Sequence, residues 1–328
     1  MLPHFSYIRP ETESEAMSQL SDPESFVLAG GTDLLGCLRE RIFPVRKLVS
    51  INGLAQFHGI TETEDGGVRI GALTTITEVE THPLIQNRFP GLARGASEVA
   101  SPQLRNQGTI GGNLCQKPRC WYYRGEFDCL RKGGSQCFAA EGQNQFHCIF
   151  GGDGICFIVH PSDTAPPLIA LNASAVIAGP KGKKRQVPLE KFHVLPADDL
   201  HKETVLNPDE MVTEILIPPP PPRTRSTYRK VRARRAWDFS LAGVALAICI
   251  EDNKVVKSRV VLSGAAPVPW RSKAVEDVIQ DRELNSKTIA DAAQAVVEGA
   301  EPLEHNQYKI PLFQGVMEEE LTALTNQA

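Results

Sequence analysis

Residues 25–35 read Ser25-Phe26-Val27-Leu28-Ala29-Gly30-Gly31-Thr32-Asp33-Leu34-Leu35, an apolar run of strand length that passes directly into two glycines, a threonine and an aspartate. The apolar run predicts a buried strand. Two adjacent glycines let backbone N–H groups point into one concavity, and Thr32 adds a hydroxyl donor, a combination that suits phosphate. Glycine pairs also occur in ordinary tight turns. The loop matches neither the G-x-G-x-x-G dinucleotide pattern nor the G-x4-G-K-[ST] pattern of nucleotide triphosphatases.

A second glycine cluster follows about eighty residues later, in the stretch Gln103-Leu104-Arg105-Asn106-Gln107-Gly108-Thr109-Ile110-Gly111-Gly112-Asn113-Leu114. It repeats the chemistry of the first loop, with backbone donors, a hydroxyl and an amide. Two such loops can hold the two ends of one pyrophosphate. The alternative interpretation is a pair of unrelated turns.

Length and composition describe a globular chain. It has 328 residues, of which 41% are hydrophobic and 23% charged, and a formal net charge of -4, which gives no general attraction for nucleic acid. The longest apolar run, Leu241 to Ile250, is about half as long as a membrane span. Residues 1–5 lack the pattern of an export signal, so we expect a cytoplasmic chain whose eight cysteines form no disulfides.

Four cysteines lie in a polar segment directly after the second glycine loop. They are Cys120, Cys129, Cys137 and Cys156, with the spacing C-x8-C-x7-C-x18-C. Four thiolates satisfy either a tetrahedral zinc ion or an iron-sulfur cluster. The spacing favours a cluster, because zinc usually takes at least one short Cys-x2-4-Cys knuckle. Cys148 is the main rival ligand, Cys115 also lies outside the quartet, and Cys37 and Cys249 are interpreted as inert core thiols.

Five consecutive prolines, Pro218 to Pro222, mark the clearest boundary in the chain. They predict a domain over residues 1–222, with the cysteine insertion at about 115–160, and a second domain over 223–328. Seven basic residues follow the prolines within residues 223–235. Strands are predicted at 25–29, 48–51, 68–72, 212–217, 242–250 and 255–262, helices at 11–20, 78–94 and 288–299, and a helix followed by a strand at 168–177.

Four motifs together resemble the FAD-binding medium subunit of the molybdenum hydroxylases, the family of xanthine dehydrogenase and carbon monoxide dehydrogenase. They are residues 28–34, Ile70-Gly71-Ala72-Leu73-Thr74, residues 103–114 and Tyr228-Arg229-Lys230-Val231-Arg232. The resemblance implies an α+β fold, a two-subdomain FAD-binding domain of the vanillyl-alcohol-oxidase type followed by a small α+β C-terminal domain. The cysteine insertion resembles the subset with an extra [4Fe-4S] cluster, and is closer to periplasmic-type aldehyde oxidoreductases than to 4-hydroxybenzoyl-CoA reductase.

The same resemblance implies roles for individual residues. The first glycine loop would wrap the FAD pyrophosphate, Asp163 would hold a ribose hydroxyl, and Lys230 would lie near the flavin or its phosphates. The quartet would ligate the [4Fe-4S] cluster. The residues implied to bind FAD are Val27, Leu28, Ala29, Gly30, Gly31, Thr32, Asp33, Leu34, Thr109, Gly112, Asn113, Asp163, Val212 and Lys230.

The function implied is electron transfer within a heterotrimeric, molybdenum-dependent aldehyde oxidoreductase. Substrate would be oxidised on a large molybdopterin-binding partner, and electrons would pass through a small [2Fe-2S] partner and this FAD to a small-molecule acceptor. No residue of the chain is assigned to substrate catalysis. The complex would be periplasmic if a partner carried a twin-arginine signal.

Three alternatives remain open from the sequence. The chain could serve a 4-hydroxybenzoyl-CoA reductase or a xanthine or N-heterocycle dehydrogenase. It could be a self-sufficient flavin oxidase, although the last hundred residues are small for a substrate cap. It could also be a zinc-stabilised scaffold without a redox role.

Overall fold

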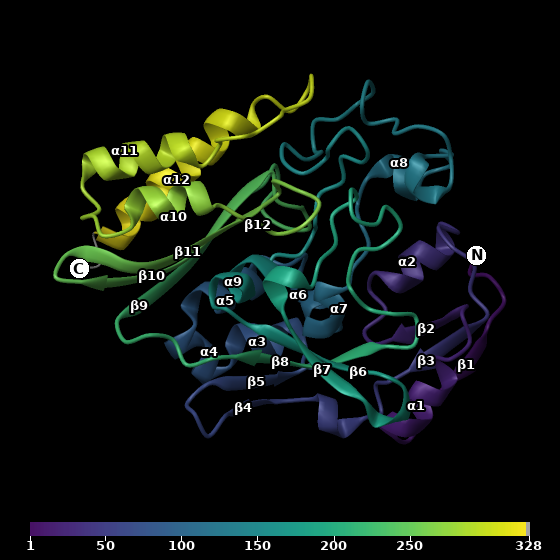
Figure 1. Ribbon diagram of the computed structural model, residues 1–328. Coiled ribbons are helices and arrows are strands. Elements are labelled where there is room, and N and C mark those ends of the chain that lie inside the picture. The colour runs from purple at the N-terminus through teal and green to yellow at the C-terminus, as the bar shows by residue number, and fades with distance from the viewer. Residues whose placement is uncertain (326–328) are drawn as a thin grey trace.

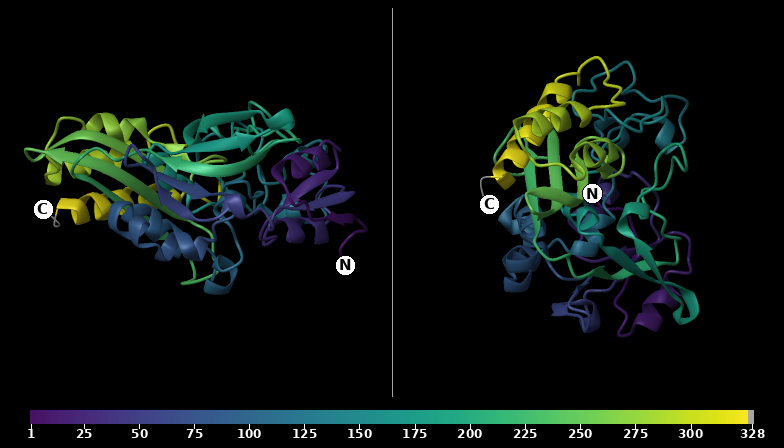
Figure 2. Two further views of the ribbon diagram at one scale, coloured as in Figure 1. Left: turned by 90° about the horizontal axis from the view of Figure 1, so that it is seen from below. Right: turned by 60° about the vertical axis from the view of Figure 1, so that its left-hand side comes forward.

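The computed structural model describes residues 1–325 and contains three β-sheets with helices packed between and around them (Figure 1). The N-terminal sheet and the C-terminal helices lie at opposite ends of the molecule (Figure 2). The strands are β1 (Ser6–Ile8), β2 (Ser25–Leu28), β3 (Lys47–Ser50), β4 (Ile60–Glu62), β5 (Val68–Gly71), β6 (Ser174–Ala178), β7 (Lys184–Pro188), β8 (Met211–Ile217), β9 (Thr224–Val231), β10 (Ala242–Glu251), β11 (Lys254–Ser263) and β12 (Trp270–Arg271). The α-helices are α1 (Glu13–Gln19), α2 (Leu34–Arg39), α3 (Ile76–Thr81), α4 (Pro83–Arg88), α5 (Pro90–Ser97), α6 (Pro102–Arg105), α7 (Ile110–Leu114), α8 (Trp121–Arg124), α9 (Ala165–Ala170), α10 (Lys273–Ile279), α11 (Ser286–Ala295) and α12 (Lys309–Thr325).

The first sheet is small and parallel, with the order β1-β3-β2. Its strands alternate with the short helices α1 and α2, as parallel pairing requires a crossover between neighbouring strands. Thr12 caps α1 by accepting a hydrogen bond from the Glu15 N–H. β2 ends at Leu28, so the first glycine loop leaves the carboxyl end of this strand and leads into α2.

The second sheet has five antiparallel strands in the order β4-β5-β8-β6-β7. Helices α3, α5 and α9 belong to the apolar core that packs against it. The predicted helix at 78–94 is divided into α3, α4 and α5, because Pro83 and Pro90 each begin a new helix at its first position. α3 begins with a capping box formed by Thr75 and Glu78.

The third sheet, β12-β11-β10-β9, separates two apolar cores. Side chains alternate between the faces of a strand. On β10, Val244, Leu246 and Ile248 therefore pack with α10 to α12, while Ala245 and Ala247 pack on the opposite face with α5 and α9. Burial on both faces explains why this strand is a nearly continuous apolar run.

The cysteine segment has little regular structure. Between α7 and α9 it forms loops interrupted by α8 and a short 3₁₀ turn at Leu130–Lys132, at the upper right of Figure 1. An aromatic group around Tyr122, with Trp121, Phe127 and Phe138, supplies part of its packing.

The α+β fold class is confirmed, and each of the predicted strands is present within a residue or two of its expected bounds. The helix and strand predicted at 168–177 are present as α9 and β6, whereas the sequence interpretation missed β1, β4, β7, β9, β12 and α12. The strongly apolar run at 241–250 is a strand, and within residues 1–325 no helix has the length and apolar character that crossing a membrane requires.

Candidate functional site

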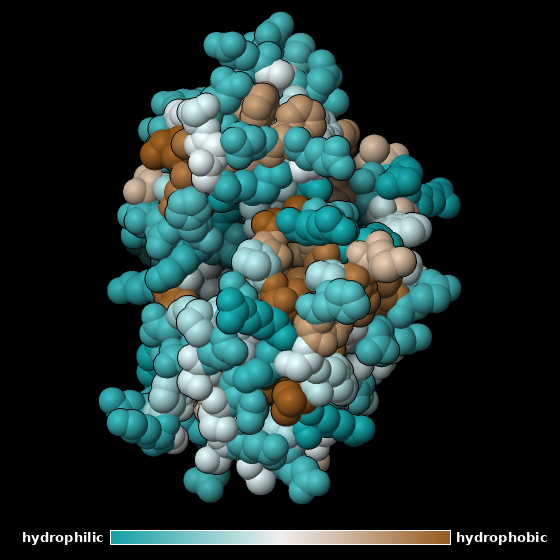
Figure 3. All heavy atoms as spheres, turned by 90° about the vertical axis from the view of Figure 1, so that its right-hand side faces the viewer, coloured by the Kyte–Doolittle hydropathy of each residue, from teal (hydrophilic) through white to brown (hydrophobic). Residues whose placement is uncertain are grey.

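A cavity of about 520 Å³ lies where the first glycine loop meets the second. Both loops line it, together with Asp163, the start of β8 and an aromatic loop at residues 237–239. Apolar side chains gather around a hollow in the face that carries α2 and α8, and hydrophilic side chains surround them (Figure 3). The volume lies within the range of sites for small ligands and cofactors.

The two glycine loops are in direct backbone contact. A Cβ atom added to Gly30 would lie 2.0 Å from the Gln107 carbonyl oxygen, so only glycine permits this approach. Gly31 has a φ of +70°, in the left-handed region that favours glycine. Glycine is thus required at both positions for different reasons, the first for contact between the loops and the second for the turn into α2.

The sequence motif at residues 70–74 explains how the second loop is held. The Ile76 N–H donates to the Gly108 carbonyl, and the Gly111 N–H donates to the Ala72 carbonyl, each at 2.9 Å. Gly111 also packs so closely on Ala72 that an added Cβ would lie 2.8 Å from the Ala72 Cβ. The segment from β5 into α3 therefore braces the second loop.

Two polar residues of the second loop face the cavity with part of their hydrogen-bonding capacity already used. The Thr109 hydroxyl accepts from the Gly112 N–H and caps α7, which leaves its proton for another acceptor. The Asn113 amide oxygen accepts from the Ser162 hydroxyl at 2.5 Å and from the Thr164 hydroxyl at 2.8 Å. The Asn113 amide NH₂ is therefore the end that can donate into the cavity.

Asp163 lines the cavity, but protein donors occupy both of its oxygens. The Lys230 ammonium lies 2.7 Å from one oxygen, and the Tyr228 hydroxyl donates to the other at 2.8 Å. Lys230 also donates to the Glu98 carbonyl, and its side chain is completely buried. Burial raises the pKa of Asp163 and the charge of Lys230 opposes that rise.

Arginines of the cysteine segment hold Asp33 at the edge of the same cavity. Its carboxylate lies 2.7 Å from Arg124 and 2.9 Å from Arg119. Its second oxygen accepts from the Lys117 backbone N–H at 2.7 Å. Asp33 is thus the link between the first glycine loop and the cysteine segment.

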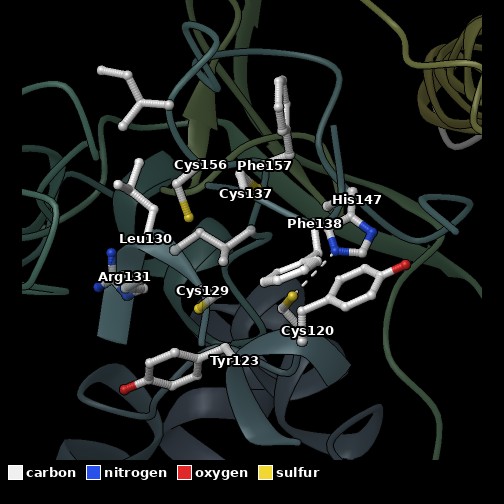
Figure 4. A pocket seen from close by; sticks show the side chains of 14 residues that line it. Cys120, Tyr123, Cys129, Leu130, Arg131, Cys137, Phe138, His147, Cys156 and Phe157 are labelled. Atoms are coloured by element: carbon white, nitrogen blue, oxygen red, sulfur yellow. Dashed lines mark hydrogen bonds between the residues drawn. The ribbon is translucent and has the colours of Figure 1, made fainter. Parts of the chain in front are cut away.

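The four predicted ligand cysteines line one pocket. Cys120, Cys129, Cys137 and Cys156 reach it from different parts of the segment, and neither Cys115 nor Cys148 lines it (Figure 4). All eight cysteines are free thiols. Burial raises the pKa of Cys120 to about 11, whereas a hydrogen bond from Cys156 lowers the pKa of Cys137.

His147 also faces this pocket. Its Nε2 lies 3.3 Å from the Cys120 sulfur, and its Nδ1 is buried without a hydrogen-bond partner among the described residues. Burial lowers the pKa of His147 to about 4, so the ring is neutral near pH 7. The neutral ring carries one proton, on either Nε2 or Nδ1. Among the described residues that proton has an acceptor only on Nε2, and the acceptor is the Cys120 sulfur.

The thiols are not gathered as they would be around a single metal ion. Across residues 1–325, no set of three or more His, Cys, Asp or Glu side chains has that arrangement. The enclosed space is only about 10 Å³, so a larger group would have to push the four side chains apart. The quartet shares a pocket without forming a closed single-ion site.

Twelve of the fourteen residues predicted to bind FAD line the cavity; Leu28 and Lys230 do not. Leu28 packs in an apolar cluster beside β3, and Lys230 lies behind Asp163. Sequence reasoning missed other lining residues, which come from the cysteine segment and from the aromatic loop just after the basic run: Lys117, Arg119, Arg124, Trp237 and Phe239. The insertion's arginines were visible as polar residues, but no spacing rule linked them to Asp33, which Arg124 follows by 91 residues.

Comparisons with known proteins agree with this geometry. Residues 3–220 match the family described as FAD binding domain in molybdopterin dehydrogenase, and residues 226–318 match the CO dehydrogenase flavoprotein C-terminal domain. The chain is 35% identical over 315 residues to the aldehyde oxidoreductase FAD-binding subunit PaoB of Escherichia coli strain K12, covering 94% of each chain. It is 29% identical to the carbon monoxide dehydrogenase medium chain of Hydrogenophaga pseudoflava, covering 92% of this chain and 89% of that one.

A solved structure of carbon monoxide dehydrogenase from Hydrogenophaga pseudoflava, lacking the Mo-pyranopterin moiety of its cofactor, superimposes with a TM-score of 0.76. Its sequence is 26% identical, and the match covers 97% of this chain and 96% of that one. The fold, the cavity between the glycine loops and these matches agree with one another. The chain belongs to the family of FAD-binding medium subunits of molybdenum hydroxylases, which are components of oxidoreductases.

Proposed function

We propose that this chain is the electron-transfer subunit of a molybdenum-dependent aldehyde oxidoreductase, with FAD in the cavity and a [4Fe-4S] cluster in the cysteine pocket. Electrons would arrive from a small [2Fe-2S] partner and leave to a small-molecule acceptor. A large molybdopterin-binding partner would oxidise the substrate. The observation that supports this most strongly is the meeting of two glycine loops at one large cavity, in a chain matched by a family of FAD-binding domains.

The residues of the cavity fit FAD. The turn from Gly30 to Asp33 presents backbone N–H groups, and Thr109 and Asn113 add a hydroxyl and an amide donor from the other loop. These donors suit the pyrophosphate. Asp163 keeps lone pairs for a ribose hydroxyl, although two protein donors already hold it. Lys230 would act through Asp163. FAD would supply the exchange between one-electron and two-electron transfer.

We favour an iron-sulfur cluster over zinc in the cysteine pocket, whose four cysteine side chains would move apart to admit it. A zinc ion would draw four sulfurs to about 2.3 Å from one point, and the described thiols are not gathered in that way. In a cluster each thiolate binds a different iron, so the sulfurs stand farther apart. The surrounding side chains are mostly apolar, apart from His147 and Arg131, and the latter is buried and ion-paired with Glu203.

We propose a division of the chain at the prolines, with FAD and cluster sites in residues 1–222 and a C-terminal domain in 223–328. The aldehyde substrate class rests on the relative with 35% identity. The alternative is a xanthine or N-heterocycle dehydrogenase, since the putative xanthine dehydrogenase FAD-binding subunit XdhB of Escherichia coli strain K12 is 30% identical over 299 residues.

The proposal is tested by separating substrate oxidation from electron delivery. The assembled complex should reduce a dye acceptor with an aldehyde as electron donor. The isolated chain, once reduced chemically, should pass electrons to the same dye but should not oxidise aldehyde. Aldehyde turnover by the isolated chain would favour a self-sufficient oxidase, and a colourless chain would favour a scaffold.

A further inference from the structure

Asp33 is held mainly by the cysteine segment, although it belongs to the first glycine loop. It precedes α2, yet its side chain makes no capping hydrogen bond to that helix. Its carboxylate is turned instead toward Arg119, Arg124 and the Lys117 N–H. The conformation of the loop at the cavity therefore depends on where the cysteine segment places these donors.

One helical turn connects these donors to the cysteine pocket. Cys120 directly precedes α8 and Arg124 ends it, and the Arg124 N–H donates to the Cys120 carbonyl at 3.0 Å. The Arg124 guanidinium is fixed further by the Pro118 carbonyl at 2.7 Å. Arg119 is the neighbour of Cys120. A group that fixes the Cys120 thiol thereby fixes both arginines.

Glu203 provides a second connection between the pocket and the loop. Its carboxylate pairs with Lys117, whose backbone holds Asp33, and with Arg131 at 2.6 Å. Arg131 lies two residues after Cys129, and its side chain is only 2% exposed. Two ion pairs and the Lys117 backbone hydrogen bond thus connect the surroundings of Cys129 to the first glycine loop.

We propose that the cysteine segment clamps the FAD loop, so that loading of the cluster and retention of FAD are coupled, with Arg119 and Arg124 as positioning residues. This inference rests on the proposed function. The segment contains little regular structure, so the cluster would supply much of the order that holds α8 in place. Without it the arginines separate from Asp33, and the loop loses the contacts that fix its shape.

The test measures the Kd for FAD by flavin fluorescence, and iron by chemical assay, in the full-length chain before and after anaerobic removal of iron with a chelator. Removing iron should raise the Kd for FAD about tenfold. Arg124→Leu should raise the Kd by a similar factor while iron is still bound, and removing iron from that variant should then add little. Because coupling is reciprocal, FAD should slow iron loss in the unaltered chain.

Arg259→Leu is the matched control. Arg259 is buried to a similar degree, at 14% exposure against 12%, and like Arg124 it bonds both carboxylate and backbone carbonyl oxygens, in its case those of Glu190 and Ile169. Its loss should leave the Kd for FAD unchanged. If Arg124→Leu fails to fold, Asp33→Asn keeps the shape of the side chain and should abolish the coupling equally.

The coupling is overturned if iron removal leaves the Kd for FAD unchanged, or raises it equally in the unaltered and the Arg124→Leu chains. A chain that binds FAD but never binds iron would overturn the cluster assignment and the coupling together. A chain that binds iron but whose Kd for FAD stays the same after iron removal would overturn the coupling alone.

Discussion

Gly30 has no side chain, and this allows two segments that are far apart in the sequence to pack against each other. A methyl group at this position would overlap the Gln107 carbonyl, so the two loops would have to separate. We expect Gly30→Ala to destabilise the chain by about 1 to 3 kcal/mol, the usual cost of overpacking, and to lower flavin retention. Thermal unfolding and the bound flavin absorbance measure both effects.

Gly315→Ala is the control for that change. Gly315 lies within α12 and has no atoms within 4 Å of an added Cβ, so alanine should be neutral or stabilise by about 0.5 to 1 kcal/mol. Full flavin content in Gly30→Ala would show that contact between the loops is not needed for the site.

Lys230 is the residue for which the structure most changes the expectation from sequence. The motif suggested contact with the cofactor, but the side chain is buried behind Asp163. We expect Lys230→Met to cost about 3 to 5 kcal/mol, because it leaves a buried carboxylate unpaired. Flavin loss would follow from this damage. Chemical denaturation gives the free energy of unfolding.

The exposed ion pair between Lys184 and Glu13 provides the comparison for Lys230. Lys184 is 48% exposed, so Lys184→Met should change stability by about 1 kcal/mol at most. The double variant Lys230→Met/Asp163→Leu should recover part of the loss, since no charge then remains unpaired. If Lys230→Met and Lys184→Met lowered the free energy of unfolding equally, the result would contradict a buried ion pair at Lys230.

At the scale of elements, the proposed cluster depends on four cysteine side chains that come from distant positions in the cysteine segment. Cys137→Ser should remove about four irons per chain together with the broad visible absorbance. Cys148→Ser should keep both, because Cys148 is buried outside the pocket. Loss of iron in Cys148→Ser, with iron kept in Cys156→Ser, would reverse the ligand choice.

α12 begins with a buried lysine that predicts a pH dependence. The Lys309 side chain is buried and donates to the Gly264 carbonyl, and burial lowers its pKa from 10.5 to about 8. At pH values between about 8 and 10.5, Lys309 holds its proton more strongly in the unfolded chain than in the folded chain. The contribution of Lys309 to stability should therefore rise with pH from about 8 to 10.5, by about 3 kcal/mol.

Lys309→Met should remove this rise, whereas Lys273→Met, at the exposed start of α10, should not. The readout is the difference in unfolding free energy between each variant and the unaltered chain, measured by denaturant titration across that pH range. Parallel curves for Lys309→Met and the unaltered chain would show that Lys309 is not the group responsible.

Sequence predicted the elements well where one local pattern decides them. In the first and third sheets, β2, β3, β10 and β11 have apolar runs bounded by turn residues, so these four strands were expected near their observed bounds. α12 was missed because its apolar residues lie among Lys309, Pro311 and three consecutive glutamates, Glu318 to Glu320. The glycine loops and the cysteine quartet were also visible locally.

The rest of the site could not be predicted, because it depends on pairing between distant segments. Nothing near Asp33 indicates that Arg124 will bind it, and nothing near Tyr228 indicates that its hydroxyl will meet Asp163. Such contacts appear only after the sheets have brought the segments together. The sequence therefore identified residues that line the cavity and the cysteine pocket more completely than the residues that hold them in place.

At the scale of the whole molecule, the chain places two sites side by side. Glu203 connects the cavity between the glycine loops with the cysteine pocket, because it pairs with Lys117, which lines the cavity, and with Arg131, which lines the pocket. The C-terminal sheet packs against the FAD-binding part through α5 and α9, so the proline boundary divides the chain in sequence more sharply than in space.

The most direct measurement is a cofactor count on the full-length chain purified without oxygen. FAD would be released and quantified, and iron, zinc and acid-labile sulfide would be assayed on the same sample. We predict about one FAD with about four iron atoms and about four sulfides per chain, and visible bands that bleach on reduction. A chain that carries zinc without sulfide, or that carries no flavin, would contradict the account.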